Sequence, residues 1–313
     1  MQKLKTNYLS TELTMSILNS KAKIAVLITC FNRKKKTLSC IQKLKQQKVQ
    51  ENIEYNVFLL DDGSTDGTGD AVKQKFPDVT LITAKGNLYW NRGMRVVWKY
   101  AQDYDNFDYY LLLNDDTDLH DAALMRLIET EKHLKKQGGK SCIIVGSISD
   151  PVDGHITYGG VVRARNYFGI KFTLVSPSKV AVPCDTFNAN CVLISRQISC
   201  DVGVLSDKFA HSMGDTDYGL RAAECGYECY VAPGIVGSCT RNETSNTWQD
   251  EELSLKERKK LLFSPKGRPP DEWRYFVRRH AGRLWVLAWL QLYMRLYFPR
   301  FWKTLRKLRG RDE

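Results

Sequence analysis

The stretch Lys23-Ile24-Ala25-Val26-Leu27-Ile28-Thr29 is a continuous apolar run. A short run of this kind predicts a strand that is buried on both faces, as in a parallel sheet. A polar turn from Cys30 to Lys36 follows, and the pattern then predicts an amphipathic helix from Thr37 to Gln47. These residues therefore predict the start of an α/β domain.

The same alternation of strands and helices continues outward from this unit. The pattern predicts strands over residues 55–60, 79–83 and 109–113, and helices ending near 76 and spanning 94–102. Polar residues follow two of these strands, over 61–68 and 114–118. Farther on we expect strands over 142–149, 191–195 and 228–232, and a helix over 217–225. Open α/β sheets bind ligands along the edge where strands end, so we predict a Rossmann-like α/β core with a ligand site there.

Size and composition narrow the class of protein. The chain has 313 residues, of which 43% are hydrophobic and 26% charged, enough for one large domain or a domain with a small appendage. Neither a signal peptide nor an apolar segment of membrane-spanning length is evident. The nine cysteines are scattered, odd in number and without a CxxC pair. We therefore expect a soluble protein of a reducing compartment, the cytoplasm.

The first polar loop, Asp61 to Thr68, has two interpretations. Asp66 or Thr68 could cap the helix that follows, which would make the loop a structural turn. Alternatively, a carboxylate at the end of the strand could accept a hydrogen bond from a ribose or a base, as acidic residues do in other nucleotide-binding folds.

The second loop reads Asn114-Asp115-Asp116-Thr117-Asp118. Clustered carboxylates repel one another unless a cation lies among them. Oxygen ligands suit Mg²⁺ or Mn²⁺, and Mg²⁺ is commonly bound by one or two carboxylates together with substrate phosphates. A capped surface turn is the alternative.

The third cluster, Gly214 to Asp217, opens a predicted helix that also carries Arg221. Asp217 and Arg221 have the spacing of an ion pair on a helix surface. Asp215 would remain free to face a cleft, where its carboxylate could take the proton from an acceptor hydroxyl.

Taken together, these motifs resemble those of glycosyltransferase family 2, which has the GT-A fold, over roughly residues 22–240. The likeness is closest to rhamnosyltransferase-like enzymes and to capsule and O-antigen transferases. The matching segments are Thr29 to Arg33, Asp61 to Thr68, Gly86 to Gly93, Asn114 to Thr117 and Asp215 to Arg221.

The resemblance implies a role for each of these segments. An inverting transfer would use Asp215 as the general base and a divalent metal, Mn²⁺ or Mg²⁺, held by Asp116. The residues expected to contact the donor nucleotide are Thr29, Asp61, Asp62, Asn87, Trp90 and Asp115. The Gly86–Gly93 segment could instead cap the core beneath a loop. The expected partners are a nucleotide diphosphate-sugar, linked to UDP or dTDP, and a glycan or lipid-linked acceptor for cell-surface polysaccharide.

Two positions depart from the family pattern. Asn114 stands where an Asp is usual, which lowers the negative charge available to a metal. Many members carry a His after the strand that follows the catalytic helix, whereas this chain has Cys239 and Arg241 in that region. A catalytically weak nucleotide-sugar-binding or scaffold protein with the transferase fold is therefore the alternative function.

The carboxyl-terminal sixty residues hold the whole charge imbalance. Residues 254–313 contain 17 Lys and Arg against 5 Asp and Glu, a net charge of +12, while residues 1–253 are neutral. Aromatic side chains alternate there with basic ones, which suits the surface of an anionic membrane through residues 271–309. A helical cap on the core or a dimer contact is the alternative, and no nucleic-acid-binding motif is present.

These observations predict three parts of the chain: a leader over 1–20, a catalytic domain over 21–253 and a basic helical extension over 254–313. We expect the protein at the inner face of the membrane. A dehydrogenase is excluded because the first strand is not followed by Gly-x-Gly-x-x-Gly.

Overall fold

The computed structural model describes residues 21–164, 170–241 and 246–302, so the expected leader lies outside the described residues. The first described element is β1 (Ala22–Cys30), which pairs in parallel with both β2 (Ile53–Asp61) and β4 (Tyr109–Leu113). β3 (Thr80–Thr83) extends this sheet in parallel beyond β2. The half of the sheet that the first apolar run predicted is therefore formed by four parallel strands.

The second half of the sheet is mixed. β12 (Cys191–Ser195) runs antiparallel between β4 and β6 (Ile143–Ser149), and β13 (Cys229–Ser238) is parallel to β6. The path of the sheet is β10-β13-β6-β12-β4-β1-β2-β3, with β10 (Val182–Cys184) at its edge. The short strands β5 (Asp118–Leu119) and β7 (Ile156–Tyr158) pair at its side. A small second sheet has the order β11-β8-β9, formed by Thr186–Phe187, Gly160–Ala164 and Lys171–Leu174.

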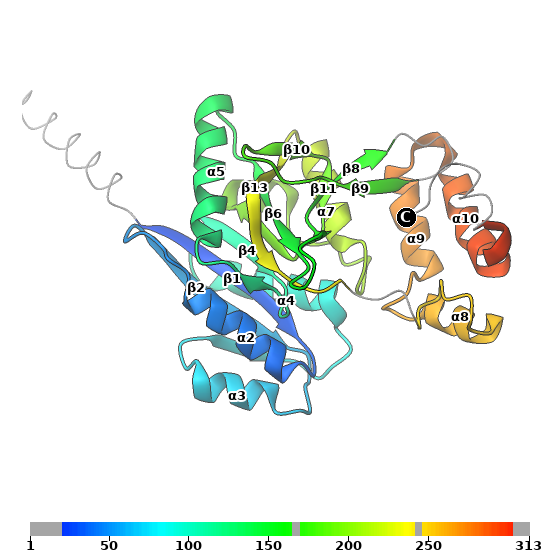
Figure 1. The fold of residues 1–313 in the computed structure, drawn as a ribbon, viewed down its shortest axis with the longest axis horizontal. Coiled ribbons are helices and arrows are strands. Elements are labelled where there is room, and N and C mark those ends of the chain that lie inside the picture. The colour runs from blue at the N-terminus through cyan, green and yellow to red at the C-terminus, as the bar shows by residue number, and fades with distance from the viewer. Residues whose placement is uncertain (1–20, 165–169, 242–245, 303–313) are drawn as a thin grey trace, which may run out of the picture.

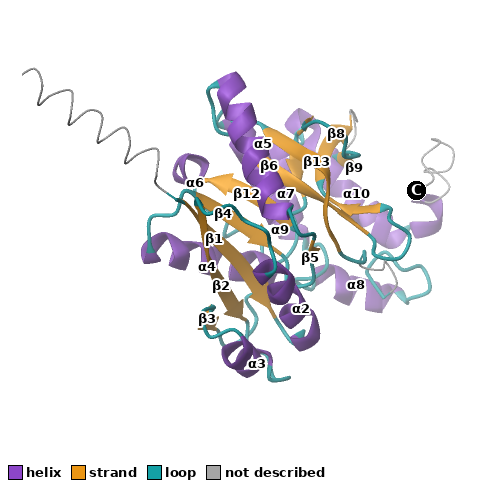
Figure 2. Cartoon of the chain, turned by 60° about the vertical axis from the view of Figure 1, so that its left-hand side comes forward, coloured by secondary structure: helices purple, strands orange, loops and turns teal. Residues whose placement is uncertain are grey.

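Helices cover both faces of the large sheet (Figures 1 and 2). Alternate residues of β1 point to opposite faces. Ile24, Val26 and Ile28 pack with α2 (Lys34–Lys45), α3 (Thr68–Lys75) and α5 (Ala123–Gly138). Ala25 and Leu27 pack with α4 (Tyr89–Tyr104), α6 (Arg196–Val202) and α7 (Gly214–Glu224). This mixed sheet between two helical layers confirms the predicted fold class.

One helix boundary differs from the sequence-based prediction and bears on the site. The helix expected over 94–102 begins at Tyr89, inside the segment expected to be a loop. The Asp62 carboxylate accepts hydrogen bonds from the backbone N–H groups of Leu88 and Tyr89, each at 2.9 Å. Those groups would otherwise be unpaired at a helix start, so a residue 26 positions away along the chain sets where α4 begins.

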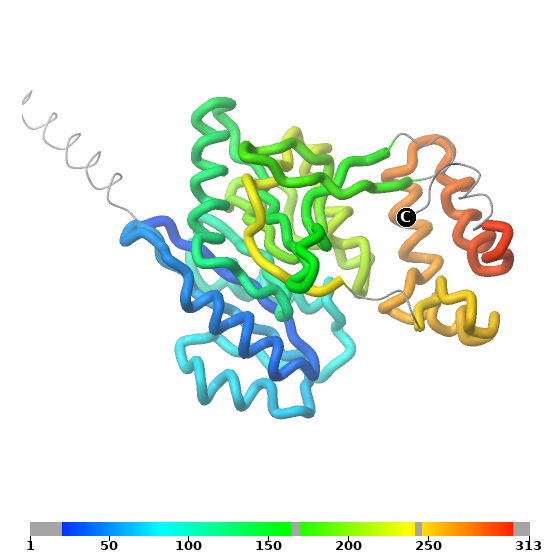
Figure 3. Tube along the Cα trace, viewed as in Figure 1, coloured from blue at the N-terminus to red at the C-terminus, as the bar shows by residue number. Residues whose placement is uncertain are grey.

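The carboxyl-terminal helices form a third group, in orange and red at one end of the molecule (Figure 3). They are α8 (Leu255–Phe263), α9 (Pro270–His280), a 3₁₀ turn at Gly282–Leu284 and α10 (Trp285–Tyr297). Their buried side chains, among them Trp273, Phe276 and Leu292, share an apolar cluster with Phe209. These helices therefore pack on the rest of the protein. Among the described residues, no helix is long and apolar enough to cross a membrane.

A buried polar contact ties α9 to α7. The Asp217 carboxylate is fully buried and lies 2.8 Å from Arg221 Nε and 2.9 Å from His280 Nε2. The expected pair between Asp217 and Arg221 is thus present, but it is buried and not on the helix surface, because His280 of α9 packs against it. A buried charge without partners is costly, so this contact makes the position of α9 depend on α7.

We predict that Asp217→Ala lowers the free energy of unfolding by about 3–5 kcal/mol, because Arg221 would remain buried without its carboxylate. Urea denaturation followed by circular dichroism measures this. Asp207→Ala is the matched control, since Asp207 pairs with Lys208 on the surface and such pairs contribute about 0–1 kcal/mol. Equal effects of the two substitutions would contradict the prediction.

Candidate active site

The predicted site residues meet at the carboxyl edge of the parallel strands. β1 pairs in register with β2 so that Thr29 lies opposite Leu60 and Cys30 opposite Asp61. On its other side, Leu27 lies opposite Leu112, which brings Asn114 to the same edge. Open α/β sheets bind ligands at such an edge. The first two acidic loops therefore lie at the same edge of the sheet, on either side of the end of β1.

Asp61 and Asp62 are both buried here and both bind backbone groups. Asp61 Oδ1 accepts a hydrogen bond from the Ser64 N–H at 2.9 Å and so holds the turn that follows β2. Asp62 caps α4, as described above. The helix cap expected at Asp66 or Thr68 is wrong, because the N-cap of α3 is Gly67 and no side chain caps the helix. Asp66 instead accepts a hydrogen bond from the Thr68 N–H at 3.0 Å, which holds the turn before α3. The loop is thus built as a structural turn whose two leading carboxylates stand at the ligand edge.

Thr29 lies under the start of α4. A side chain at Gly93 would come within 3.2 Å of the Thr29 methyl group, so glycine lets the helix approach β1 closely. Asn87, just before the helix, is exposed and has a left-handed backbone with φ of 69°. Asparagine tolerates this conformation better than most residues.

Trp90 connects α4 to the second acidic loop. Its indole Nε1–H donates a hydrogen bond to Asn114 Oδ1 at 2.8 Å, and its ring is partly buried against the apolar core. The capping role weighed for this segment is therefore present. The same contact gives the Asn114 side chain a structural partner at the start of the second acidic loop.

The carboxylates of Asp115 and Asp116 share a cation from the chain itself. Arg33 Nη1 lies 3.2 Å from Asp115 Oδ1 and 2.8 Å from Asp116 Oδ2, and Lys36 Nζ lies 3.7 Å from Asp116 Oδ2. Burial raises the pKa of Asp115 to about 6, against the opposing effect of Arg33. Arg33 lies within one of the motifs named above, but the sequence alone predicted no role for its side chain. Its contact spans 82 positions, which no local pattern reveals.

Asp115 and Asp116 are the candidate ligands for a divalent metal. Over the described ranges, no three His, Cys, Asp or Glu side chains are grouped so that they alone could hold a metal ion. Asp116, with Asp115 beside it, does fit the arrangement in which one or two carboxylates bind the ion and substrate phosphates complete its shell. The residues thus fit a metal that arrives with a diphosphate, rather than one caged by protein alone.

Cys239 and Arg241 occupy different surroundings. Cys239 is buried beside Asp116, and burial together with the Asp116 charge raises the pKa of the Cys239 thiol to about 12. Arg241 is exposed. Of the two residues considered as replacements for the family histidine, Cys239 is therefore the one that lies against the acidic loop, as a neutral thiol.

Asp215 lies in the first turn of α7 and is joined to the acidic loop through the segment before β12. Its Oδ2 accepts a hydrogen bond from the Ala189 N–H at 3.2 Å, and the next residue, Asn190, accepts one from the Asn114 N–H at 3.1 Å. Burial raises the pKa of Asp215. Asp215 and Asn114-Asp115-Asp116 thus stand on two sides of one short backbone segment.

The loop before α7 is hydrogen-bonded to the start of α4. The backbone N–H of Trp90 donates to His211 Nδ1 at 3.4 Å, and that of Asn91 donates to the Ala210 carbonyl at 3.1 Å. Burial, together with the nearby charges of Lys266 and Arg33, lowers the pKa of His211 to about 4. His211 is therefore neutral near pH 7. Sequence reasoning missed it, although an isolated His four residues before Asp215 was a usable signal.

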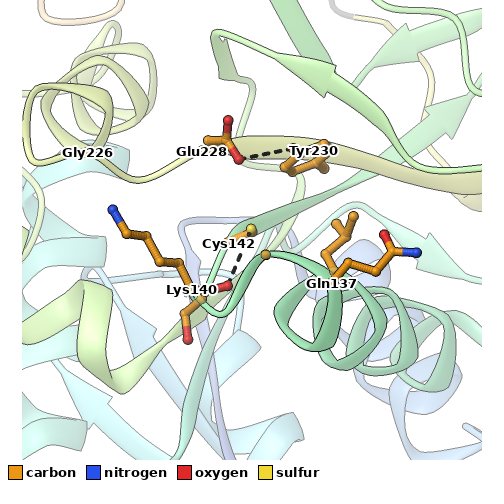
Figure 4. A pocket seen from close by; sticks show the side chains of 9 residues that line it. Gln137, Lys140, Cys142, Gly226, Glu228 and Tyr230 are labelled. Atoms are coloured by element: carbon orange, nitrogen blue, oxygen red, sulfur yellow. Dashed lines mark hydrogen bonds between the residues drawn. The ribbon is translucent and has the colours of Figure 1, made fainter.

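A cavity of about 430 Å³ lies at the other edge of the sheet (Figure 4). It is lined at the start of β6 by Cys142 and around the start of β13 by Glu228 and Tyr230, with Gln137 and Lys140 from the end of α5 and the turn after it. Because β6 and β13 are parallel, this is the edge where strands begin. None of the predicted site residues lines this cavity.

Comparison with known proteins bears on the class of this one. Residues 25–158 match the family model described as glycosyl transferase family 2. Two relatives from Mycobacterium tuberculosis, strains CDC 1551 / Oshkosh and ATCC 25618 / H37Rv, are N-acetylglucosaminyl-diphospho-decaprenol L-rhamnosyltransferases. Each is 23% identical over 201 residues, which are 57% of this chain, and the chain spans 64% of their length.

A solved structure agrees in fold. The mannosyltransferase of Pyrobaculum calidifontis, in complex with GDP-Man and Mn²⁺, matches with a TM-score of 0.52 at 14% identity, over 92% of this chain and 84% of that one. The chain therefore has the GT-A fold, and its residues 25–158 are similar to glycosyl transferase family 2. The resemblance found in the sequence is confirmed.

We predict that Arg33→Gln strengthens the effect of Mn²⁺ on thermal stability, because the guanidinium no longer competes for the two carboxylates. A tenfold gain in affinity at saturating metal would raise the Tm by about 2–4 °C more than in the wild type. Differential scanning fluorimetry with Mn²⁺ or EDTA measures this. Lys35→Gln, at an exposed neighbouring position, is the control. A rise equal to that of the wild type would count against a metal at Asp115 and Asp116.

Proposed function

We propose that the protein is an inverting glycosyltransferase that moves a sugar from a nucleotide diphosphate-sugar, linked to UDP or dTDP, to a glycan or lipid-linked acceptor in cell-surface polysaccharide synthesis. Residues 21–253 would be the catalytic unit and residues 254–313 an extension. The observation that carries the proposal is the hydrogen-bonded link from Asp215 through Ala189 and Asn190 to Asn114. It brings a candidate base beside a candidate diphosphate site.

In this mechanism Asp215 acts as the general base. Its carboxylate takes the proton of the acceptor hydroxyl while that oxygen forms a bond to the anomeric carbon, and the bond from this carbon to the diphosphate breaks with its electron pair. Direct displacement inverts the anomeric centre. The Ala189 and Thr216 N–H groups hold the carboxylate in one orientation. Such positioned base catalysis is typically worth about 10²–10⁴-fold.

The leaving diphosphate needs positive charge at the other side of the site. Asp116, with Asp115, would hold a divalent metal, which stabilises the charge that develops on the phosphate oxygens. The solved neighbour that carries GDP-Man and Mn²⁺ supports this choice of metal. Arg33 already lies at the same carboxylates and supplies a second cation to the diphosphate.

The nucleotide would lie over the edge formed by Thr29, Asp61 and Asp62, with Asn87 and Trp90 beside it. The acceptor would approach from the side of α7. The relatives that act on a decaprenol-linked sugar support a lipid-linked acceptor. A protein with such an acceptor would work at the inner face of the membrane.

The test is release of free nucleotide diphosphate from a panel of UDP-, dTDP- and GDP-sugars with Mn²⁺, Mg²⁺ or EDTA. We expect metal-dependent release from one donor, loss of the metal dependence in Asp116→Ala, and a fall of roughly 10²–10⁴-fold in Asp215→Asn with donor binding retained. Asp207→Asn, on the surface, is the matched control.

Other outcomes of this panel have definite meanings. Donor binding without cleavage, unchanged when acceptor glycolipids are added, would favour the scaffold alternative. The sequence has no His over residues 239–253, and this absence is the observation that favours the scaffold alternative. No binding of any donor would overturn the roles of Asp61 and Asp62.

A pH profile tests the role of Asp215 separately. Because burial raises its pKa above the usual value of about 3.9, the carboxylate becomes protonated as the pH falls through this raised value, and a protonated base cannot accept the acceptor proton. We therefore expect kcat/KM to fall on the acidic side at a pH above about 4. The residual activity of Asp215→Asn should lack this acidic limb, and a limb that persists unchanged in the variant would assign it to another group.

A further inference from the structure

The outer side of α10 carries a stripe of large apolar side chains. Leu287, Leu290 and Met294 are 39%, 44% and 38% exposed, and Tyr297, the last residue of the helix, is 47% exposed. Their spacing of three and four residues places them along one side of a helix. This stripe is the surface that we call the α10 face.

The α10 face is not needed for packing within the described structure. The opposite side of the helix, with Ala288, Leu292 and Leu296, is buried against α9 and α8. Figure 1 shows α10 on the outer side of α9, away from α7. A helix on the surface of a globular protein ordinarily turns polar residues outward, and contiguous exposed apolar patches mark interaction sites.

Basic residues are exposed on the elements next to α10 in the chain. Arg283 is exposed at the start of the helix, and Arg274 and Arg278 are exposed on the neighbouring α9. Residues 254–313 as a whole have a net charge of +12. Apolar and aromatic side chains flanked by Arg and Lys are the composition of helices that lie in the interface of an anionic membrane.

We propose that the α10 face docks on an anionic phospholipid surface, with α10 lying in the plane of the interface. A second copy of the chain is the less favourable occupant, because joining two α10 faces would bring together two segments of like charge. This inference extends the proposed function, since a lipid-linked acceptor would be presented at the same surface.

Docking through α10 would also fix the orientation of the site. Besides the buried contact of His280 with Asp217, Glu272 at the start of α9 accepts a hydrogen bond from the Ala210 N–H at 3.3 Å. Ala210 in turn binds the start of α4. Both α4 and α7 are therefore held to α9, and α9 carries α10.

The experiment is flotation of the full chain with phosphatidylglycerol vesicles and, separately, with phosphatidylcholine vesicles. We expect binding to the anionic vesicles, weakened by salt, and far less to the neutral ones. The double variant Leu290→Glu with Met294→Glu should bind at least tenfold more weakly, because each side chain withdrawn from the lipid is worth roughly tenfold. The matched control is Val152→Glu with Val180→Glu, at exposed apolar positions outside the extension.

Each other outcome of these experiments has a definite meaning for the proposal. Equal vesicle binding by the wild type and the α10 variant would overturn the proposal, as would equal loss in the control. A dimer of the wild type that the α10 variant loses, seen by light scattering without any vesicle binding, would assign the face to a second copy instead. Release of nucleotide diphosphate from soluble donors should be unchanged in the α10 variant, so that failure of the proposed reaction and failure of docking are read separately.

Discussion

The pairing of β1 with two parallel neighbours is the constraint on which the site depends. Because β2 and β4 flank the same strand in parallel, the loops that follow all three must leave the sheet at one edge. Asp61 and Asp116 are 55 positions apart along the chain, yet they stand at the same edge of the sheet, where the two strands that flank β1 end. Near-continuous apolar strands are required for this, since the sheet is covered by helices on both faces.

At that edge, polar contacts rather than apolar packing set the positions of the loops. Asp62 fixes the start of α4, Trp90 of α4 holds Asn114, and Asn190 holds the backbone of the same asparagine. Arg33 balances the charge of Asp115 and Asp116, which would otherwise repel each other in a buried place. The edge is thus organised before any ligand arrives, and such preorganisation is what electrostatic catalysis requires.

The local sequence pattern was sufficient to predict most strands of the large sheet. The strands over 109–113 and 191–195 were predicted with the bounds that the structure has, since each is a short apolar run between polar turns. The start of α4, the partner of Arg33 and the place of His211 were not predictable, because each depends on a residue far away along the chain. The roles of Asp215 and Asp116 stay predictions, although their surroundings suit them.

The carboxyl-terminal helices link the proposed membrane surface to the proposed active site. If α8–α10 were only a cap, their buried contacts with Phe209 and Asp217 would suffice, and a polar outer side would serve solubility better. The α10 face instead adds exposed apolar area where the chain is most basic, which costs solubility unless something covers it. An anionic membrane would cover the exposed apolar side chains of α10 and would also attract the positive charge of residues 254–313. It would also hold α7 at one orientation toward that surface, through Asp217 and His280.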